Sequence, residues 1–162
     1  MSTMTDRRTA GFLVLIGVAA LGLAYGTEHL LGMVPCELCL WERWPYRIVL
    51  LLGALGLILP AGARRLMLWL AALALLANLG ISFLHVGVEH GWWPSPLPEC
   101  SASNILTGNL SQLIAKLPSH PAKPCDAPSF LIPGLPVSFA TMDFLFTLLC
   151  LGLLLGQLRP KR

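Results

Sequence analysis

The sequence predicts an all-α fold: a four-helix transmembrane bundle with two outer loops, the second of which contains a short amphipathic helix. Of the 162 residues, 56% are hydrophobic and only 12% are charged, whereas about a quarter of an average soluble domain is charged. The apolar residues form long blocks without the period-two alternation of membrane barrel strands. These observations exclude a soluble globule and a disordered chain.

Four blocks are long enough for membrane helices, since a helix needs roughly 20 mostly apolar residues to cross a bilayer. They cover residues 10–27, 44–59, 66–88 and 139–158. Backbone polar groups must be paired inside lipid, which favours a helix for each block. The first block also suits a cleavable signal peptide because Arg7 and Arg8 precede it, but no small-x-small cleavage site closes it. We therefore expect a single integral membrane domain over residues 1–162.

The positions of the cations predict the orientation, because Lys and Arg near span ends stay on the cytoplasmic side. Seven of them flank the spans on one side: Arg7, Arg8, Arg64, Arg65, Arg159, Lys161 and Arg162. Both termini are thus expected in the cytoplasm, with outer loops over residues 28–43 and 90–138. The net charge of +3 is too small for a basic surface that binds nucleic acid.

The long outer loop holds nine of the 13 prolines, so no continuous helix is expected through it. Four leucines at helical spacing predict a short amphipathic helix within it: Leu106, Leu110, Leu113 and Leu117. Whether this helix lies on the membrane or packs locally is left open by the sequence.

Four of the five cysteines lie in the outer loops. Cys36 and Cys39 form a C-x-x-C pair, whose disulfide would stabilise the fold by only about 2 kcal/mol before strain. A bond between Cys100 and Cys125 would contribute roughly 3.5 kcal/mol by the same estimate. The C-x-x-C pair is therefore expected to act chemically, with one reactive thiol and one that resolves a mixed disulfide. Cys150, inside the fourth span, is expected to be an inert packing residue.

The neighbours of the C-x-x-C pair favour a redox role. Pro35 is expected to start a helix with Cys36 and Cys39 in its first turn, where unpaired amide groups favour a thiolate. Arg43 follows Cys39 by four residues on the same helical face, which makes Cys39 the candidate for a stabilised thiolate. The alternative is that Arg43 extends to lipid headgroups. Pro45 is expected to break or kink this helix, so that the second span begins again there.

A polar stripe follows one face of the third predicted span: Asn78, Ser82, His85 and Glu89. Such a stripe more often supplies hydrogen bonds between helices than lines a cofactor pocket. His90 stands at the outer boundary, where it could donate to a quinone carbonyl or relay a proton, or simply be exposed. The sequence assigns no role to Asn78, His85 or Arg47.

Together these features resemble the disulfide bond formation protein B (DsbB) family of bacterial inner-membrane thiol oxidases. The matching residues are Pro-Cys-Glu-Leu-Cys-Leu-Trp-Glu-Arg from Pro35 to Arg43, the pair Glu89 and His90, Pro94-Ser95-Pro96 before Cys100, and Cys125. With four spans, the resemblance covers nearly the whole chain.

The resemblance implies a quinone-dependent protein-disulfide oxidoreductase that spans the bacterial inner membrane several times. A disulfide between Cys100 and Cys125 would receive electrons from a reduced DsbA-like thioredoxin-fold protein in the periplasm, which attacks Cys100. Cys125 would then exchange with Cys36, leaving Cys39 as a thiolate next to a membrane quinone, either ubiquinone or menaquinone. By the same resemblance, Arg43 would stabilise that thiolate.

The resemblance also implies that His90 lies beside the quinone, and no metal site is expected. One alternative is a relative that serves a different periplasmic thiol partner. A four-thiolate zinc site would need reduced thiols in an oxidising compartment, and its second cysteine pair lacks the usual spacing. A transporter or assembly factor with purely structural cysteines is disfavoured by the absence of repeated halves.

Overall fold

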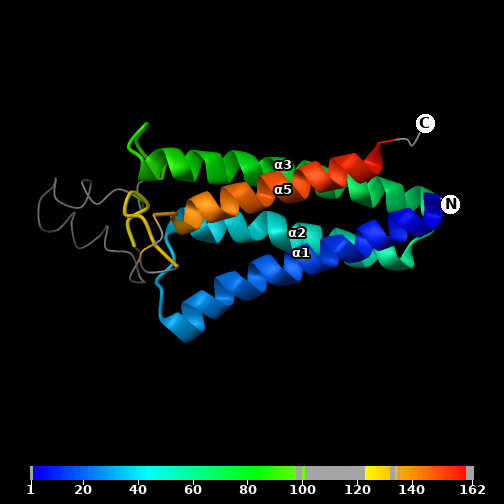
Figure 1. The fold of residues 1–162 in the computed structure, drawn as a ribbon, viewed down its shortest axis with the longest axis horizontal. Coiled ribbons are helices and arrows are strands. Elements are labelled where there is room, and N and C mark those ends of the chain that lie inside the picture. The colour runs from blue at the N-terminus through cyan, green and yellow to red at the C-terminus, as the bar shows by residue number, and fades with distance from the viewer. Residues whose placement is uncertain (1, 98–99, 101–122, 132–133, 135, 160–162) are drawn as a thin grey trace, which may run out of the picture.

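The computed structural model describes residues 2–97, 100, 123–131, 134 and 136–159. Its four helices are α1 (Ser2–Leu31), α2 (Glu37–Ile58), α3 (Ala61–Glu89) and α5 (Phe139–Leu158). They lie side by side in one elongated bundle, with both termini at the same end (Figure 1). The described residues contain no strand, only an isolated bridge between Phe130 and Ser138. The all-helical fold class is confirmed, while the amphipathic helix predicted over residues 106–117 lies outside the described residues.

Three of these helices are long and apolar enough to cross a membrane: Met4–Leu31 within α1, Ala61–Glu89 and Phe139–Leu158. The helix α2 is also long, but every 18-residue stretch of it includes Glu42, Arg43 and Arg47. Glu42 and Arg43 are nevertheless buried. These two charged side chains are therefore covered by the protein itself.

The break expected at Pro45 is wrong, because α2 runs without interruption from Glu37 to Ile58 and contains Pro45. Proline removes one backbone donor and its ring crowds the preceding turn. A membrane helix tolerates this where neighbouring helices pack around it, and Pro45 is buried. The C-x-x-C region and the second apolar block thus belong to one continuous helix, α2.

The halves of α1 and α2 nearest the termini are in close contact because small residues lie between them. At Gly53 an added Cβ would lie 2.9 Å from the backbone nitrogen of Val14 and 3.0 Å from the carbonyl oxygen of Ala10. Small residues let membrane helices approach to backbone contact, where dispersion forces are strongest. The surrounding core contains fully buried aliphatic side chains, among them Leu13, Val49, Leu68, Leu75 and Leu154.

Polar contacts close the same end of the bundle. The buried Arg64, in the first turn of α3, donates hydrogen bonds to the carbonyls of Gly56 (2.7 Å) and Leu59 (2.9 Å) at the end of α2. These bonds satisfy carbonyl groups that a helix end leaves without a partner in the helix. Thr9 of α1 donates to the side chain of Gln157 in α5 at 2.6 Å. The first and last helices are thereby fixed to each other beside the termini.

Candidate functional site

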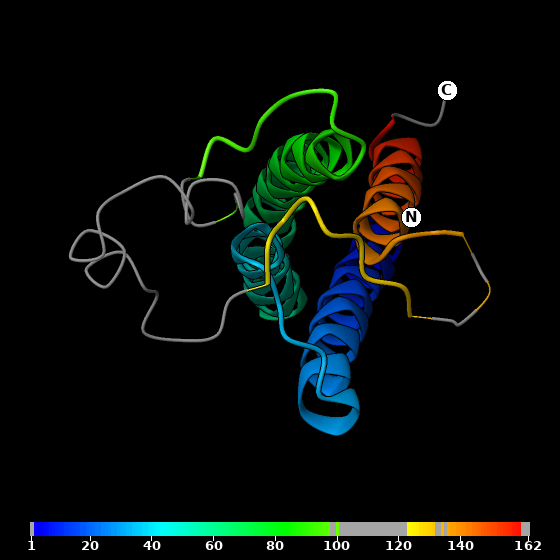
Figure 2. The same ribbon diagram turned by 90° about the vertical axis from the view of Figure 1, so that its left-hand side faces the viewer.

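The two cysteine pairs meet at the end of the bundle opposite the termini. Cys36, Cys100 and Cys125 are buried in one hydrophobic cluster, and Cys39 packs against it. Cys100 and Cys125 form a disulfide, whereas Cys36 and Cys39 are free thiols. Figure 2 looks onto this end, where the segment leading from Cys125 crosses the start of α2. Because Cys100 and Cys125 are bonded to each other, the four-thiolate zinc site is not formed in this structure.

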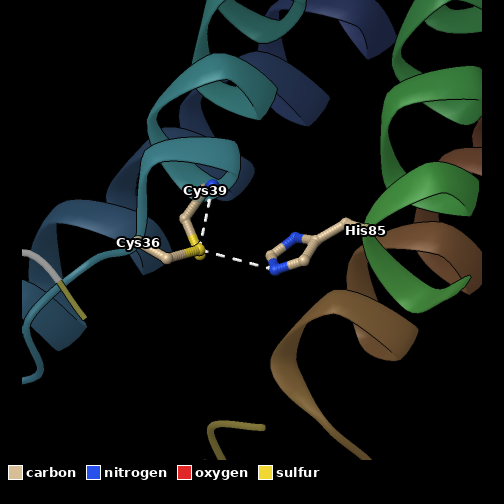
Figure 3. A group of neighbouring side chains, drawn as sticks. All are labelled: Cys36, Cys39 and His85. Atoms are coloured by element: carbon tan, nitrogen blue, oxygen red, sulfur yellow. Dashed lines mark hydrogen bonds between the residues drawn. The ribbon is translucent and has the colours of Figure 1, made fainter. Parts of the chain in front are cut away.

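Cys36 caps the start of α2. Its backbone is extended, and its sulfur accepts a hydrogen bond from the backbone N–H of Cys39 at 3.3 Å. Cys39 lies in the first turn, as expected, and Cys36 lies directly before that turn. The cap places the Cys36 sulfur over the turn that carries Cys39, as Figure 3 shows.

A histidine from α3 contacts the Cys36 sulfur. Nε2 of His85 lies 3.4 Å from Sγ of Cys36 (Figure 3), and Nδ1 of His85 lies 2.9 Å from Oε1 of Glu42 on α2. His85 and Glu42 are only 2% and 5% exposed. The two sulfurs of the C-x-x-C pair and a ring nitrogen of His85 all lie within 4.8 Å of one another. A buried base thus stands next to a buried thiol.

A cavity of about 200 Å³ opens between α1, α2 and α5 beside the C-x-x-C pair. An engineered cavity of about 150 Å³ holds benzene, so this volume suits a six-membered ring. Most of the lining is apolar and comes from α1 and α5, including Ala20, Leu21, Ala24, Phe139, Met142 and Phe146. The polar and sulfur groups in its wall are Cys39, Glu42, Arg43, Tyr46 and Asp143. Figure 1 shows α1 diverging from the other helices toward this end.

Arg43 lines this cavity and does not extend to the membrane surface. It is 6% exposed. Its Nη1 lies 2.7 Å from Oε2 of Glu28 on α1, and its guanidinium lies over the ring of Tyr25, 4.9 Å from the ring centre. Among the described residues, no hydrogen-bond partner accepts from its buried Nε. One donor of a fixed cation is therefore available beside the cavity.

Cys39, which the sequence suggests as a stabilised thiolate, lies in the first turn of α2. This turn is at the outer end of α2, before the second membrane span predicted over residues 44–59. There the neighbouring Cys36 thiol and burial raise the pKa of the Cys39 thiol, and the Glu42 carboxylate adds to this effect. The Arg43 guanidinium, which was expected to lower that pKa, is paired with Glu28. The Cys39 thiol therefore needs a proton acceptor before it reacts.

His90 does not join this group. It lies exposed at the end of α3, with its ring 5.4 Å from that of Trp92, and it is not among the described residues that line the cavity. Its role beside a quinone stays a prediction. Arg47, to which the sequence assigned no role, donates to the hydroxyl of Tyr25 and lies over the ring of Trp44.

Below the cysteines, a buried polar network joins three helices. Tyr46 of α2 donates to Asp143 of α5 at 2.6 Å. Asn78 of α3 donates to Asp143 at 3.1 Å and to Thr147 at 2.9 Å. Asn78 of the polar stripe thus connects helices, as His85 does through Glu42, whereas Ser82 donates to carbonyls of its own helix, those of Asn78 and Leu79.

The segment that follows α3 folds back over the cysteine cluster. The indole N–H of Trp93 donates to the carbonyl of Leu84 at 3.0 Å. Its ring lies against Gly87, where an added Cβ would be 2.0 Å from Cζ2 of Trp93. Trp93 also packs against the cysteine cluster, together with Leu97. A glycine at position 87 is therefore what lets this segment approach α3 and bring Cys100 to Cys36.

Sequence reasoning missed the contact between Cys36, His85 and Glu42. The available signal was the polar stripe of α3, in which His85 stands four residues before Glu89. The sequence assigned no separate role to Glu42, since a carboxylate near an interface is usually solvated. Their partnership joins residues 43 positions apart, so no local pattern reveals it.

Comparison with known proteins is consistent with this site. Residues 6–156 match the sequence profile of a family described as "Disulfide bond formation protein DsbB". A protein named "Disulfide bond formation protein B" from Dechloromonas aromatica is 36% identical over 88 residues, covering 52% of this chain and 48% of the relative. One of the same name from Acinetobacter baumannii is 29% identical over 118 residues, covering 71% and 65%.

An uncharacterised protein from Rickettsia prowazekii is 30% identical over 146 residues, covering 89% of this chain and 82% of the relative. The chain therefore spans about half the length of the Dechloromonas protein in that match, and most of the length of the Rickettsia protein. No solved structure matches.

Proposed function

Because this chain belongs to the DsbB family of disulfide bond formation proteins, we propose that it is a membrane thiol-disulfide oxidoreductase. In this proposal it reoxidises a periplasmic DsbA-like thioredoxin-fold dithiol and passes the electrons to a membrane quinone. The observation that carries the proposal is one buried cluster that contains both cysteine pairs, with Cys39 also in the wall of a ring-sized cavity. The protein would lie in the bacterial inner membrane with both termini in the cytoplasm.

The proposed electron route is the one that the resemblance to the DsbB family implies. A thiolate of the reduced partner attacks Cys100, which forms a mixed disulfide and releases Cys125. Exchange between Cys125 and a disulfide of Cys36 and Cys39 then moves two electrons inward. The structure has the outer pair oxidised and the C-x-x-C pair reduced. That combination corresponds to the stage at which the electrons have reached the pair beside the cavity.

The cavity fits a quinone in size and chemistry. When bound, a quinone supplies an acceptor for two electrons and two protons. The apolar walls from α1 and α5 suit a ring that enters from lipid. The unpaired Nε of Arg43 offers a hydrogen bond to a carbonyl oxygen, and Cys39 lines the same space. These residues do not distinguish ubiquinone from menaquinone.

The proposal is tested by mixing the purified protein anaerobically with a reduced DsbA-like protein and a soluble quinone, and by following quinol formation. The parent should turn over, and Cys39→Ser should abolish quinol formation. Cys100→Ser should prevent the mixed disulfide with the partner. Cys150→Ala is the matched control, because Cys150 is a free cysteine buried in the core away from the cavity.

Unchanged quinol formation in Cys39→Ser would contradict the proposal. A parent that oxidises another thioredoxin-fold protein but not the DsbA-like one would identify it instead as a relative with a different thiol partner.

A further inference from the structure

A continuous series of contacts leads from the Cys36 thiol to the cavity. The sulfur of Cys36 lies 3.4 Å from Nε2 of His85. The other ring nitrogen, Nδ1, lies 2.9 Å from Oε1 of Glu42, and Glu42 lines the cavity. Each member is at least nine-tenths buried. The thiol is thus connected to the cavity by two direct contacts between buried side chains.

The direction of these hydrogen bonds is set by the carboxylate. A carboxylate oxygen can only accept, so Nδ1 of His85 carries the proton that is shared with Glu42. In the neutral imidazole the opposite nitrogen, Nε2, then has a free lone pair, and the group that faces it is the thiol of Cys36. The histidine is therefore oriented to accept a proton from Cys36 and to pass one on to Glu42.

The proposed reaction needs such a path. Oxidation of two thiols to a disulfide breaks two S–H bonds, forms one S–S bond and releases two electrons and two protons. Reduction of a quinone to a quinol consumes the same two electrons and two protons. Cys39 lies in the cavity wall and can release its proton there, whereas Cys36 is not among the described residues that line the cavity. The proton of Cys36 has the longer distance to cover.

We propose that His85 and Glu42 carry the proton of the Cys36 thiol to the quinone cavity. This inference rests on the proposed function and adds two catalytic residues to it. The S–H proton moves to Nε2 as the Nδ1 proton moves to the Glu42 carboxylate, and the Cys36 thiolate then bonds to the Cys39 sulfur. The two electrons pass to the quinone. Glu42 would release that proton to a quinone in the cavity and return to a carboxylate, and His85 would regain its starting tautomer by exchanging the Nε2 proton for one on Nδ1 before the next turnover.

Other ionisable groups surround His85 and affect how readily it takes up a proton. Cys36, Cys39 and Glu42 face it from the start of α2. Glu89 lies on its own helix, and Asp143 acts on it from α5.

The competing interpretation is that His85 and Glu42 form a buried ionic contact that only joins α3 to α2. Glu42→Gln separates the two interpretations. A glutamine oxygen still accepts the hydrogen bond from Nδ1, so the helix contact and the tautomer persist, but the amide cannot take up a proton. A structural role predicts normal turnover for Glu42→Gln, whereas the proton path predicts a large loss.

Turnover with a DsbA-like dithiol and a soluble quinone is measured for His85→Gln and Glu42→Gln across a range of pH. Loss of a general base lowers rates by roughly 100-fold or more, and we expect a loss of that size in both variants. The double variant should be no slower than the slower single variant, because both residues lie on one path.

Raising the pH should restore much of the activity of His85→Gln, since hydroxide then removes the Cys36 proton. His29→Gln is the control, as His29 is exposed on α1 and does not line the cavity.

A second measurement does not use the quinone reaction. In quinone-free protein carrying Cys39→Ser and Cys150→Ala, with the Cys100–Cys125 disulfide intact, Cys36 is the remaining free thiol. Its ionisation is followed by the ultraviolet absorbance of the thiolate. Adding His85→Gln should raise the pH midpoint by about one unit or more, because no imidazole is left to take up the Cys36 proton and to donate a hydrogen bond to the thiolate. Adding His29→Gln should leave the midpoint unchanged.

The outcomes are distinguishable. If the parent protein forms no quinol, the proposed function fails. If the parent is active and folded Glu42→Gln or His85→Gln retains parental turnover, the proton path is overturned while the proposed function stands. An unchanged thiolate midpoint in His85→Gln would likewise overturn the role of His85, even if the variant loses activity through misfolding.

Discussion

The two ends of this bundle are held together by different means. Beside the termini, α1 and α2 touch through glycine, and aliphatic side chains complete the core. At the opposite end, the helices bury Glu42, Arg43 and His85 around two cysteine pairs. Close apolar packing stabilises a membrane protein directly, whereas a buried ionisable group is costly unless it is paired. The difference teaches that the packed end is stabilised mainly by close contacts between helices, whereas the cysteine end contains buried ionisable groups that must be paired with one another.

The largest effect on stability is expected from a substitution at the packed end of the bundle. Gly53→Leu would force a side chain into the backbone of Val14 and Ala10, and overpacking of this kind costs about 1–3 kcal/mol. We expect a marked loss of thermal stability in detergent, measured by intrinsic fluorescence. Gly152→Leu is the matched control, because nothing lies within 4 Å of the position of its Cβ. Equal melting temperatures for the two variants would show that the contact between α1 and α2 does not stabilise the bundle.

A smaller effect is expected at the cysteine end, and on function more than on stability. Arg43→Lys retains a positive charge near Glu28 but removes the Nε donor that has no partner among the described residues. The loss of one charge-assisted hydrogen bond should raise the KM for quinone about tenfold, without changing formation of the mixed disulfide with the thiol partner. Steady-state kinetics at varied quinone concentration measure this.

Arg65→Ala is the control for that experiment, since Arg65 is exposed in the first turns of α3, at the end of the bundle that carries the termini. Quinone kinetics of Arg43→Lys that equal those of the parent would remove Arg43 Nε from the binding site.

The smallest effect is expected in the polar network that lies between the two ends. Asn78→Ala removes the hydrogen bonds to Asp143 and Thr147. Hydrogen bonds between membrane helices contribute about 0.6 kcal/mol on average, so the free energy of unfolding should fall by about 1 kcal/mol. Ser82→Ala should have almost no effect, because Ser82 bonds only within α3. Denaturation in mixed micelles compares the two, and a larger loss for Ser82→Ala would contradict this description of the network.

Parts of the site were accessible from the sequence because they depend on neighbours along the chain. The spacing of Cys36 and Cys39 and the start of a helix at this point are local features, and both are present in the structure. The interruption expected at Pro45 failed because that rule considers one helix alone, and here the neighbouring helices surround it. The pairing of Arg43 with Glu28 was also missed, since it depends on how closely α1 approaches α2.

The sequence by itself determined that the chain is helical and apolar enough for a membrane, and that four of its cysteines are spaced as a C-x-x-C pair followed by two more distant cysteines. Hydropathy and helical period are properties of consecutive residues, which explains why they can be read without a structure. Only the tertiary structure decided that His85 faces Cys36, that Glu42 supports it and that a cavity lies beside Cys39. These relations depend on how each helix is rotated about its axis against the others, and many long-range contacts acting together set that rotation.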